Sequence, residues 1–140
     1  MIIVSACLAG IRCRYDGGCK PDPNVMALVR EGKALPLCPE SLGGLPCPRE
    51  PSEIVGSRVL ACDGRDVTER FNKGAEEVLR VAKMYGVTEA ILKAHSPSCG
   101  IGLVYDGSFS GKLVTGDGIT ARLLMENGIN CTPEKGGSNG

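Results

Sequence analysis

The chain has 140 residues, enough for one domain with a buried core, and its sixteen acidic and sixteen basic side chains cancel. This balance gives no indication of binding to nucleic acid or to an anionic membrane surface, and no apolar run reaches the ~18–20 residues that span a bilayer. Eight cysteines is a high number for this length. Because the predicted helices and strands need no disulfide staples, we expect a cytoplasmic protein whose cysteines bind a metal or perform thiol chemistry.

Strand-like and helix-like segments alternate along the chain. They are predicted, in chain order, as a strand at 2–6, a helix between 21 and 32, strands at 34–37 and 59–62, a helix at 67–85, a strand at 90–92, a helix at 119–127 and a strand at 129–132. Irregular loops are expected at 8–20, 38–56 and 95–118, the last with a hairpin around 105–113. Pro36 requires the second strand to be short or to lie at a sheet edge.

The longest predicted helix has a clear start, face and end. Asp66 with Glu69 three residues later makes a capping-box-like start, and Gly86 ends the helix. Its apolar face is expected to comprise Phe71, Ala75, Val78, Leu79, Ala82 and Tyr85. The order of elements predicts an α/β single domain with a small, mostly parallel sheet and flanking helices, a Rossmann-like three-layer arrangement. A disordered tail is expected at 135–140.

Three cysteines follow three predicted strands. Cys7 ends the first strand, Cys38 follows the second, and Cys99 lies just beyond the strand at 90–92. Since ligands bind beyond the carboxyl ends of parallel strands, we expect these cysteines to meet at one edge of the sheet. The absence of any Cys-x-x-Cys pair excludes zinc ribbons and thioredoxin-type motifs. Three such thiolates could bind zinc, or hold three irons of a four-iron cluster and leave one iron open.

The remaining five cysteines are interpreted separately. Cys62 and Cys131 lie on or beside apolar strands, so we read them as small buried hydrophobes. Cys19 and Cys47 lie in loops and show no partner pattern. Cys13 is ambiguous, because it could supply a second ligand from the first loop or have no role at the site.

Polar residues beside these cysteines offer further chemistry. Glu40, two residues after a candidate ligand, is either a general acid or base near the metal or an ordinary solvated loop carboxylate. The hydroxyls of Ser96 and Ser98 either position substrate or water, or form a capping turn. Arg12 and Arg14 either orient an anionic or carbonyl-bearing ligand, or are solvated loop charges.

Five ordered motifs in this chain resemble one known family. They are Cys7-Leu8-Ala9-Gly10 followed by Cys13-Arg14-Tyr15-Asp16-Gly17, Cys38-Pro39-Glu40-Ser41-Leu42-Gly43-Gly44-Leu45-Pro46, Asp66-Val67-Thr68, Ser96-Pro97-Ser98-Cys99-Gly100 and Tyr105-Asp106-Gly107-Ser108-Phe109-Ser110-Gly111. With them the chain resembles the domain-of-unknown-function 523 family, whose characterised members are thiouracil desulfidases. The resemblance implies one such domain over residues 1–134. Two positions depart from the family pattern: Ala9 stands where Leu is common, and Cys47 where Thr is common.

The resemblance also implies a cofactor and a reaction. The cofactor is a [4Fe-4S] cluster held by Cys7, Cys38 and Cys99. The fourth iron binds the sulfur of a thiolated nucleobase as a Lewis acid, and water replaces that sulfur with no net redox change. Three residues match the family positions for proton transfer and for positioning substrate or water: Glu40, Ser96 and Ser98.

Two alternatives from other functional classes stay open. One is a non-catalytic protein that stores or senses a metal or cluster, and the other is a metal-free sulfur carrier with Cys99 as the exposed nucleophile. Glu40 favours the enzyme, because a storage site has no use for a carboxylate there. The partner of the enzyme is expected to be a small thiolated nucleobase, not nucleic acid or a membrane. We expect a monomer or small homo-oligomer.

Overall fold

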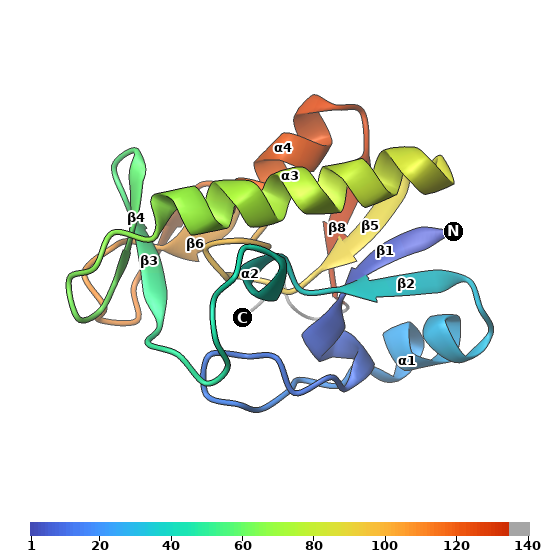
Figure 1. Ribbon diagram of the computed structural model, residues 1–140, viewed down its shortest axis with the longest axis horizontal. Helices are drawn as coiled ribbons and strands as arrows, with labels where there is room; N and C mark the ends of the chain where they lie inside the picture. The colour runs from blue at the N-terminus through green and yellow to red at the C-terminus, as the bar shows by residue number, and fades with distance from the viewer. Residues whose placement is uncertain (135–140) are drawn as a thin grey trace.

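The sheet at the centre of the molecule has four strands in the order β2-β1-β5-β8, and every neighbouring pair is parallel (Figure 1). In this computed structural model, which describes residues 1–134, the strands are β1 (Ile2–Ser5), β2 (Ala34–Leu37), β5 (Glu89–Leu92) and β8 (Asn130–Pro133). The parallel α/β sheet expected from the sequence is confirmed. The tail predicted at 135–140 lies outside the described residues. None of the helices within 1–134 is long and apolar enough to cross a membrane.

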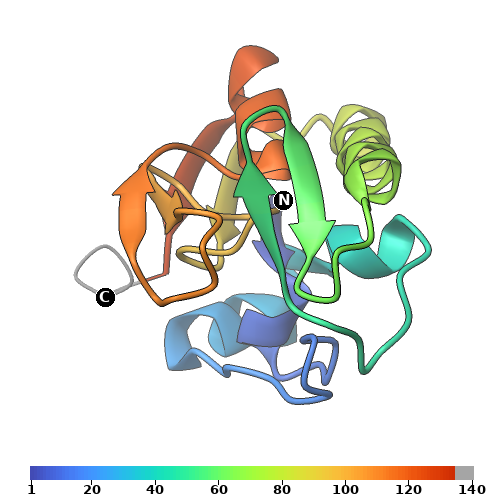
Figure 2. The same cartoon turned by 90° about the vertical axis from the view of Figure 1, so that its left-hand side faces the viewer.

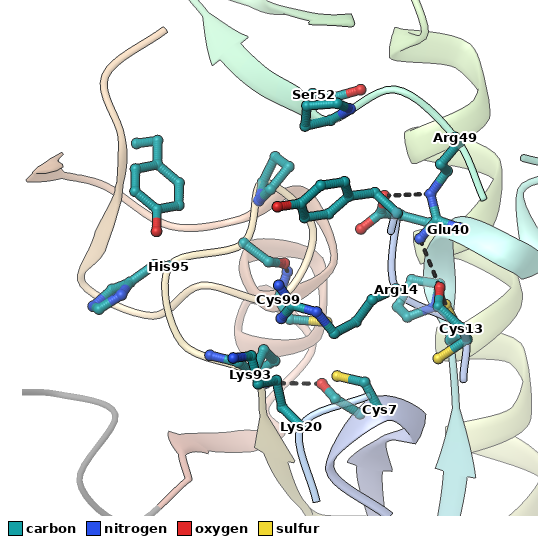
Figure 3. Close-up of a pocket in the computed structure, with 18 of the residues that line it drawn as sticks. Cys7, Cys13, Arg14, Lys20, Glu40, Arg49, Ser52, Lys93, His95 and Cys99 are labelled. Atoms are coloured by element: carbon teal, nitrogen blue, oxygen red, sulfur yellow. Dashed lines mark hydrogen bonds and ion pairs between the residues drawn. The ribbon is translucent and has the colours of Figure 1, made fainter. Parts of the chain in front are cut away.

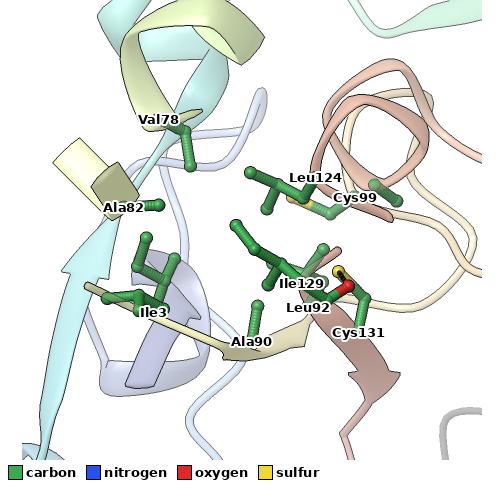
Figure 4. Packing of buried hydrophobic residues seen from close by; sticks show 11 residues of the cluster. Ile3, Val78, Ala82, Ala90, Leu92, Cys99, Leu124, Ile129 and Cys131 are labelled. Atoms are coloured by element: carbon green, nitrogen blue, oxygen red, sulfur yellow. Dashed lines mark hydrogen bonds between the residues drawn. The ribbon is translucent and has the colours of Figure 1, made fainter. Parts of the chain in front are cut away.

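Helices cover both faces of this sheet and complete the three layers. One face carries the 3₁₀ helix η1 (Ala6–Ala9) and α1 (Pro23–Arg30), and the other carries α3 (Thr68–Tyr85) and α4 (Ile119–Glu126). Since successive strand residues point to opposite faces, Ile3 packs toward α3 and α4, whereas Val4 packs toward α1. Figure 4 shows the larger core, in which Leu92 of β5 lies among Val78 of α3 and Leu124 of α4.

β2 is both short and an edge strand, in agreement with the expectation from Pro36. Pro36 is paired with Val4 of β1, and among residues 1–134 no strand pairs with the other side of β2. A proline is tolerated there because its missing N–H group removes no bond from the sheet interior. The helix before β2 begins at Pro23, where Asp22 accepts a hydrogen bond from the backbone N–H of Val25 at 3.0 Å.

The start of α3 differs from the predicted capping box. The helix begins at Thr68, and Asp66 accepts a hydrogen bond from the backbone N–H of Thr68 at 2.9 Å, not from Glu69. The Thr68 hydroxyl is turned inward and accepts a hydrogen bond from the backbone N–H of Val59 at 2.8 Å. This side-chain anchor shifts the helix start by one residue. At the other end Gly86 closes the helix as expected, but Tyr85 is exposed, since the last turn extends beyond the core.

Two segments expected to be irregular contain regular elements. They hold α2 (Pro39–Leu42), β3 (Ser52–Val55), β6 (Leu103–Tyr105) and β7 (Leu113–Thr115). β3 pairs antiparallel with β4 (Arg58–Ala61) around Gly56, and β6 pairs with β7 in the hairpin expected from the sequence. The prolines and glycines that suggested a loop mark the ends of these elements: Pro39 is the first residue of α2, and Gly56 has a φ of 63° in the turn.

α2 lies directly against α3, and two glycines permit the close approach. A Cβ atom at Gly74 of α3 would overlap the carbonyl oxygen of Pro39, and one at Gly43 would overlap the carbonyl oxygen of Arg70. The two backbones therefore touch without side chains between them. This contact sets the position of α2, which carries Glu40.

Candidate functional site

A pocket of about 750 Å³ lies beyond the carboxyl ends of β1, β2 and β5. Figure 2 looks onto this edge of the sheet, with the β3–β4 and β6–β7 hairpins side by side in front of it. Buried Glu53 of β3 joins the hairpins, because it accepts hydrogen bonds from the backbone N–H groups of Gly107 and Phe109 at 2.9 and 3.1 Å. The pocket thus has the position in which parallel α/β sheets bind ligands.

The three cysteines that follow the strands all line this pocket. Cys7 lies in η1 directly after β1, and Cys99 lies in the turn after β5 (Figure 3). Cys38 directly follows β2. Cys7 and Cys99 are buried, with 8% and 4% of their surface exposed, and Cys38 is half-buried. The structure therefore brings these three cysteines together at one edge of the sheet, as expected from the sequence.

The thiols differ in how readily they lose a proton. Burial raises the pKa of Cys7 to about 11 and that of Cys99 to about 12. A hydrogen bond from the neighbouring Cys13 thiol lowers the pKa of Cys38 to about 5, against the effect of its burial, and the same contact raises the pKa of Cys13. Cys38 is therefore the thiol of the three that loses its proton most readily, whereas a cation beside the two deeper thiols would help them to ionise.

Glu40 is a largely buried carboxylate rather than a solvated loop charge. Its side chain is 18% exposed, and its Oε1 atom accepts a hydrogen bond from Nε of Arg49 at 3.1 Å. Burial raises the pKa of Glu40, and the Arg49 charge opposes the rise. Arg49 also donates to the carbonyl oxygens of Cys13 and Pro46, so its guanidinium fixes the carboxylate relative to the first loop.

The two serines have different positions. Ser96 lines the pocket, and its oxygen accepts hydrogen bonds from the backbone N–H groups of Cys99 at 2.7 Å and Ser98 at 3.2 Å. Its own hydroxyl proton remains available to a ligand. Ser98 is 1% exposed, lies outside the pocket lining and shares a 2.8 Å hydrogen bond with the Thr120 hydroxyl of α4. The structure thus joins Ser96, but not Ser98, to the cysteines and Glu40.

For the other cysteines, some of the predictions from the sequence agree with the structure and others do not. Cys13 lines the pocket beside the ligand candidates, and Cys131 is buried in the larger core, as expected. The prediction for Cys62 is wrong: it is exposed, because β4 ends at Ala61, and its thiol donates to Glu50 at 2.9 Å. Burial also overturns the interpretation of Cys99 as an exposed nucleophile.

Three lining residues were missed or left undecided by sequence reasoning. Arg49 sits in a segment without periodicity, and only the fold brings it to Glu40. Arg14 and His95 line the pocket, and each has a buried side-chain nitrogen without a hydrogen-bond partner. Arg14 was noted as a charge that could orient a ligand, and the low exposure of its side chain agrees with that reading.

The side chains around the pocket are not arranged for a single metal ion. Within residues 1–134, no group of three or more His, Cys, Asp or Glu side chains is placed to hold one.

Fold and site together define a class: a small three-layer α/β protein with a thiol-lined pocket at the carboxyl edge of a parallel sheet. The sequence profile of the 2-thiouracil desulfurase family matches residues 2–136, and the chain belongs to this family. This confirms the resemblance found from the motifs.

Two relatives extend the comparison. The Bacillus subtilis (strain 168) protein named "Uncharacterized protein YbbK" is 44% identical over 144 residues, covering 96% of this chain and 95% of that protein. The solved structure of the "[4Fe-4S]-dependent thiouracil desulfidase TudS" superimposes with a TM-score of 0.92 at 45% identity, over 99% of this chain and 93% of that one. The α/β fold is therefore shared along nearly the whole chain.

Proposed function

We propose that this protein is an enzyme that removes sulfur from thiouracil or a similar small thiocarbonyl compound, with water supplying the oxygen that replaces it. The observation that carries the proposal is the meeting of Cys7, Cys38 and Cys99 with Glu40 and Ser96 in one pocket. Membership of the 2-thiouracil desulfurase family and the similarity to a [4Fe-4S]-dependent thiouracil desulfidase support the same reaction.

The donor set fits a [4Fe-4S] cluster held by Cys7, Cys38 and Cys99. Cysteine thiolates are the usual ligands of such clusters, and the three thiols surround a cavity instead of meeting at a point. A cluster of four irons and four sulfides occupies a wider space than one ion, so its ligands stand farther apart. When bound, a cluster with three protein ligands supplies an open iron that acts as a Lewis acid toward a soft thiocarbonyl sulfur.

Glu40 and Ser96 carry the proton transfers in this proposal. Burial raises the pKa of Glu40, which suits a carboxyl group that takes a proton from water as the oxygen attacks the ring carbon. The Arg49 guanidinium keeps this carboxyl aimed in one direction. Ser96 is fixed by two backbone N–H groups and has its hydroxyl proton free to hold the attacking water or the ring.

The proposal extends to the setting in which the enzyme works. A thiolated nucleobase is a small neutral molecule, and a pocket of about 750 Å³ has room for it. Eight free cysteines and a cluster that is sensitive to oxidation suit the reducing cytoplasm. We expect a monomer or small homo-oligomer that needs neither nucleic acid nor a membrane for activity.

Anaerobic purification tests this function directly. Iron and acid-labile sulfide are measured after reconstitution, and about four irons per chain are expected. The protein is then assayed on 2-thiouracil and 4-thiouracil for release of sulfide and formation of uracil. Cys99→Ser should lose the cluster and the activity, whereas the matched control Cys131→Ser, at another buried cysteine outside the pocket, should keep both.

The same measurements separate the alternatives. A full cluster without sulfide release from either compound would favour the storage or sensing protein. Turnover without iron would favour a sulfur carrier, in which one cysteine is indispensable and the others are not. Fewer than about three irons per chain after reconstitution would contradict the cluster.

A further inference from the structure

Two buried side-chain nitrogens in the described part of the chain have no hydrogen-bond partner, and both belong to residues that line the same pocket. They are Nε of Arg14 and Nε2 of His95. The Asp16 carboxylate lies 3.7 Å from Arg14 Nε, beyond hydrogen-bond distance. Since buried polar groups in folded proteins are almost always bonded, two exceptions in one pocket indicate that a ligand completes them.

The backbone at His95 is held in an unfavourable conformation. Its φ is 70°, in the left-handed region that residues other than glycine rarely adopt. A bridge to Val104 fixes its backbone, and its ring lies edge-on to Tyr105 with the ring centroids 6.2 Å apart and the planes at 70°. Strain of this kind persists where the surroundings enforce it, and it concentrates at functional sites. The backbone that carries the imidazole is therefore fixed beside the pocket.

The position of His95 suggests which part of a ligand it meets. It directly precedes Ser96, and in Figure 3 it lies on the side of the pocket away from Cys7 and Cys13. A thiolated pyrimidine with its sulfur toward the cysteines presents another edge of the ring, with a carbonyl oxygen and ring N–H groups, toward the opposite side. An imidazole nitrogen can donate to the oxygen or accept from an N–H group.

We propose that His95 binds the polar edge of the pyrimidine ring through Nε2, and so orients the ring with its sulfur toward the cysteines. This inference rests on the proposed function, because it takes the pyrimidine as the ligand. His95 acts as a positioning residue that selects rings with a polar edge opposite the sulfur. Losing this hydrogen bond is expected to raise KM for 2-thiouracil about tenfold, with a smaller change in kcat.

A matched pair of variants isolates the Nε2 atom. The amide nitrogen of His95→Gln reaches the position of Nε2, whereas that of His95→Asn reaches only the position of Nδ1, and Asn tolerates the left-handed backbone. We expect His95→Asn to show the tenfold rise in KM and His95→Gln to stay within about threefold of the parent. Iron content and Tm are measured for all three proteins, and uracil binding by calorimetry is expected to follow the same order.

The unaltered protein offers a readout that no folding defect affects. His95 is the only histidine, so the imidazole ¹⁵N signals of the holoprotein belong to it alone. Saturating uracil should shift the Nε2 signal more than the Nδ1 signal. An unmoved Nε2 signal, or equal KM values for His95→Asn and the parent, would overturn the inference and leave the desulfidase standing. If the parent releases no sulfide, the proposed function fails, and the uracil signal shift still decides the role of His95.

Discussion

Glu40 is the residue on which the proposed acid–base step depends. Glu40→Gln keeps the size of the side chain and an oxygen for Arg49, but it cannot exchange a proton with water. We expect kcat to fall by about 10²–10⁴-fold, the usual contribution of a general acid or base. Iron content should be unchanged, because the amide leaves the three cysteines in place. Sulfide release under saturating 2-thiouracil gives the rate.

A second carboxylate serves as the control. Glu89 is exposed at the amino end of β5, on the far edge of the sheet from the pocket. Glu89→Gln should keep the parent rate. If Glu40→Gln lost iron as well as activity, Glu40 would be a structural support of the metal centre rather than an acid or base.

The site residues that could be predicted from the sequence are those that follow the ends of predicted strands. Cys7, Cys38 and Cys99 could be placed together because the carboxyl ends of parallel strands share an edge. Ser98 could not be separated from Ser96, since both flank one proline and only the packing of α4 turns Ser98 toward Thr120. Partners that meet only through the fold, such as Arg49 and Glu40, leave no spacing in the sequence.

Among the elements, α2 depends most on a single contact. Gly74→Ala would place a methyl group against the carbonyl oxygen of Pro39 and push α2 from α3. Alanine favours a helix over glycine by about 1 kcal/mol, but overpacking costs about 1–3 kcal/mol, so a net loss of stability is expected. Because α2 carries Glu40, activity should fall as well. Urea unfolding measures the stability, and Lys73→Ala, at an exposed neighbouring position, should leave both unchanged.

The start of α3 predicts a dependence of stability on pH. The Asp66 carboxylate accepts hydrogen bonds from Arg58 and from Thr68. These bonds lower the pKa of Asp66 from 3.8 to about 2. Because the folded pKa is the lower one, the charged Asp66 stabilises the fold above pH 3.8, and this contribution is lost as the pH falls toward 2. Thermal unfolding across this range should show the loss.

Two substitutions divide this effect into charge and cap. Asp66→Asn removes the charge and keeps an oxygen for the Thr68 N–H, whereas Asp66→Ala removes both. At pH 7 we expect Tm to decrease from the parent to Asp66→Asn to Asp66→Ala. The difference between the parent and Asp66→Asn should shrink between pH 4 and 2. A constant difference would show that the Arg58 pair does not set the pKa.

Most strands of the central sheet were predictable because β1, β2 and β5 are short, largely apolar runs next to helices with clear ends. α2 and β3 were not, since their segment is dense in proline and glycine and carries no periodicity. What defines them is tertiary: α2 rests on Gly74, and β3 exists through its pairing with β4. Both elements line the pocket. The part of the lining that comes from α2 and β3 was therefore less predictable than the part that comes from the ends of β1, β2 and β5.

At the scale of the whole molecule, the pocket ties together segments that are far apart in the chain. Its lining comes from the ends of β1, β2 and β5 and from both hairpins. The two apolar cores on the faces of the sheet reach this edge, since Cys99 belongs to one core and Cys7 to the other. A ligand bound to the three cysteines would join these segments directly.

Loading of the cluster should accordingly stabilise the fold. If Cys7, Cys38 and Cys99 hold it as proposed, binding to the folded state alone adds about 3 kcal/mol at a few hundred times the dissociation constant, or roughly 10 °C in Tm for a chain of this size. Thermal unfolding of the apo and reconstituted proteins under anaerobic conditions measures the shift. Amide exchange should slow at 6–9, 38–42 and 95–100 and stay unchanged in α1. Equal Tm values, or slowing spread evenly over the chain, would contradict a cluster that bridges three strand ends.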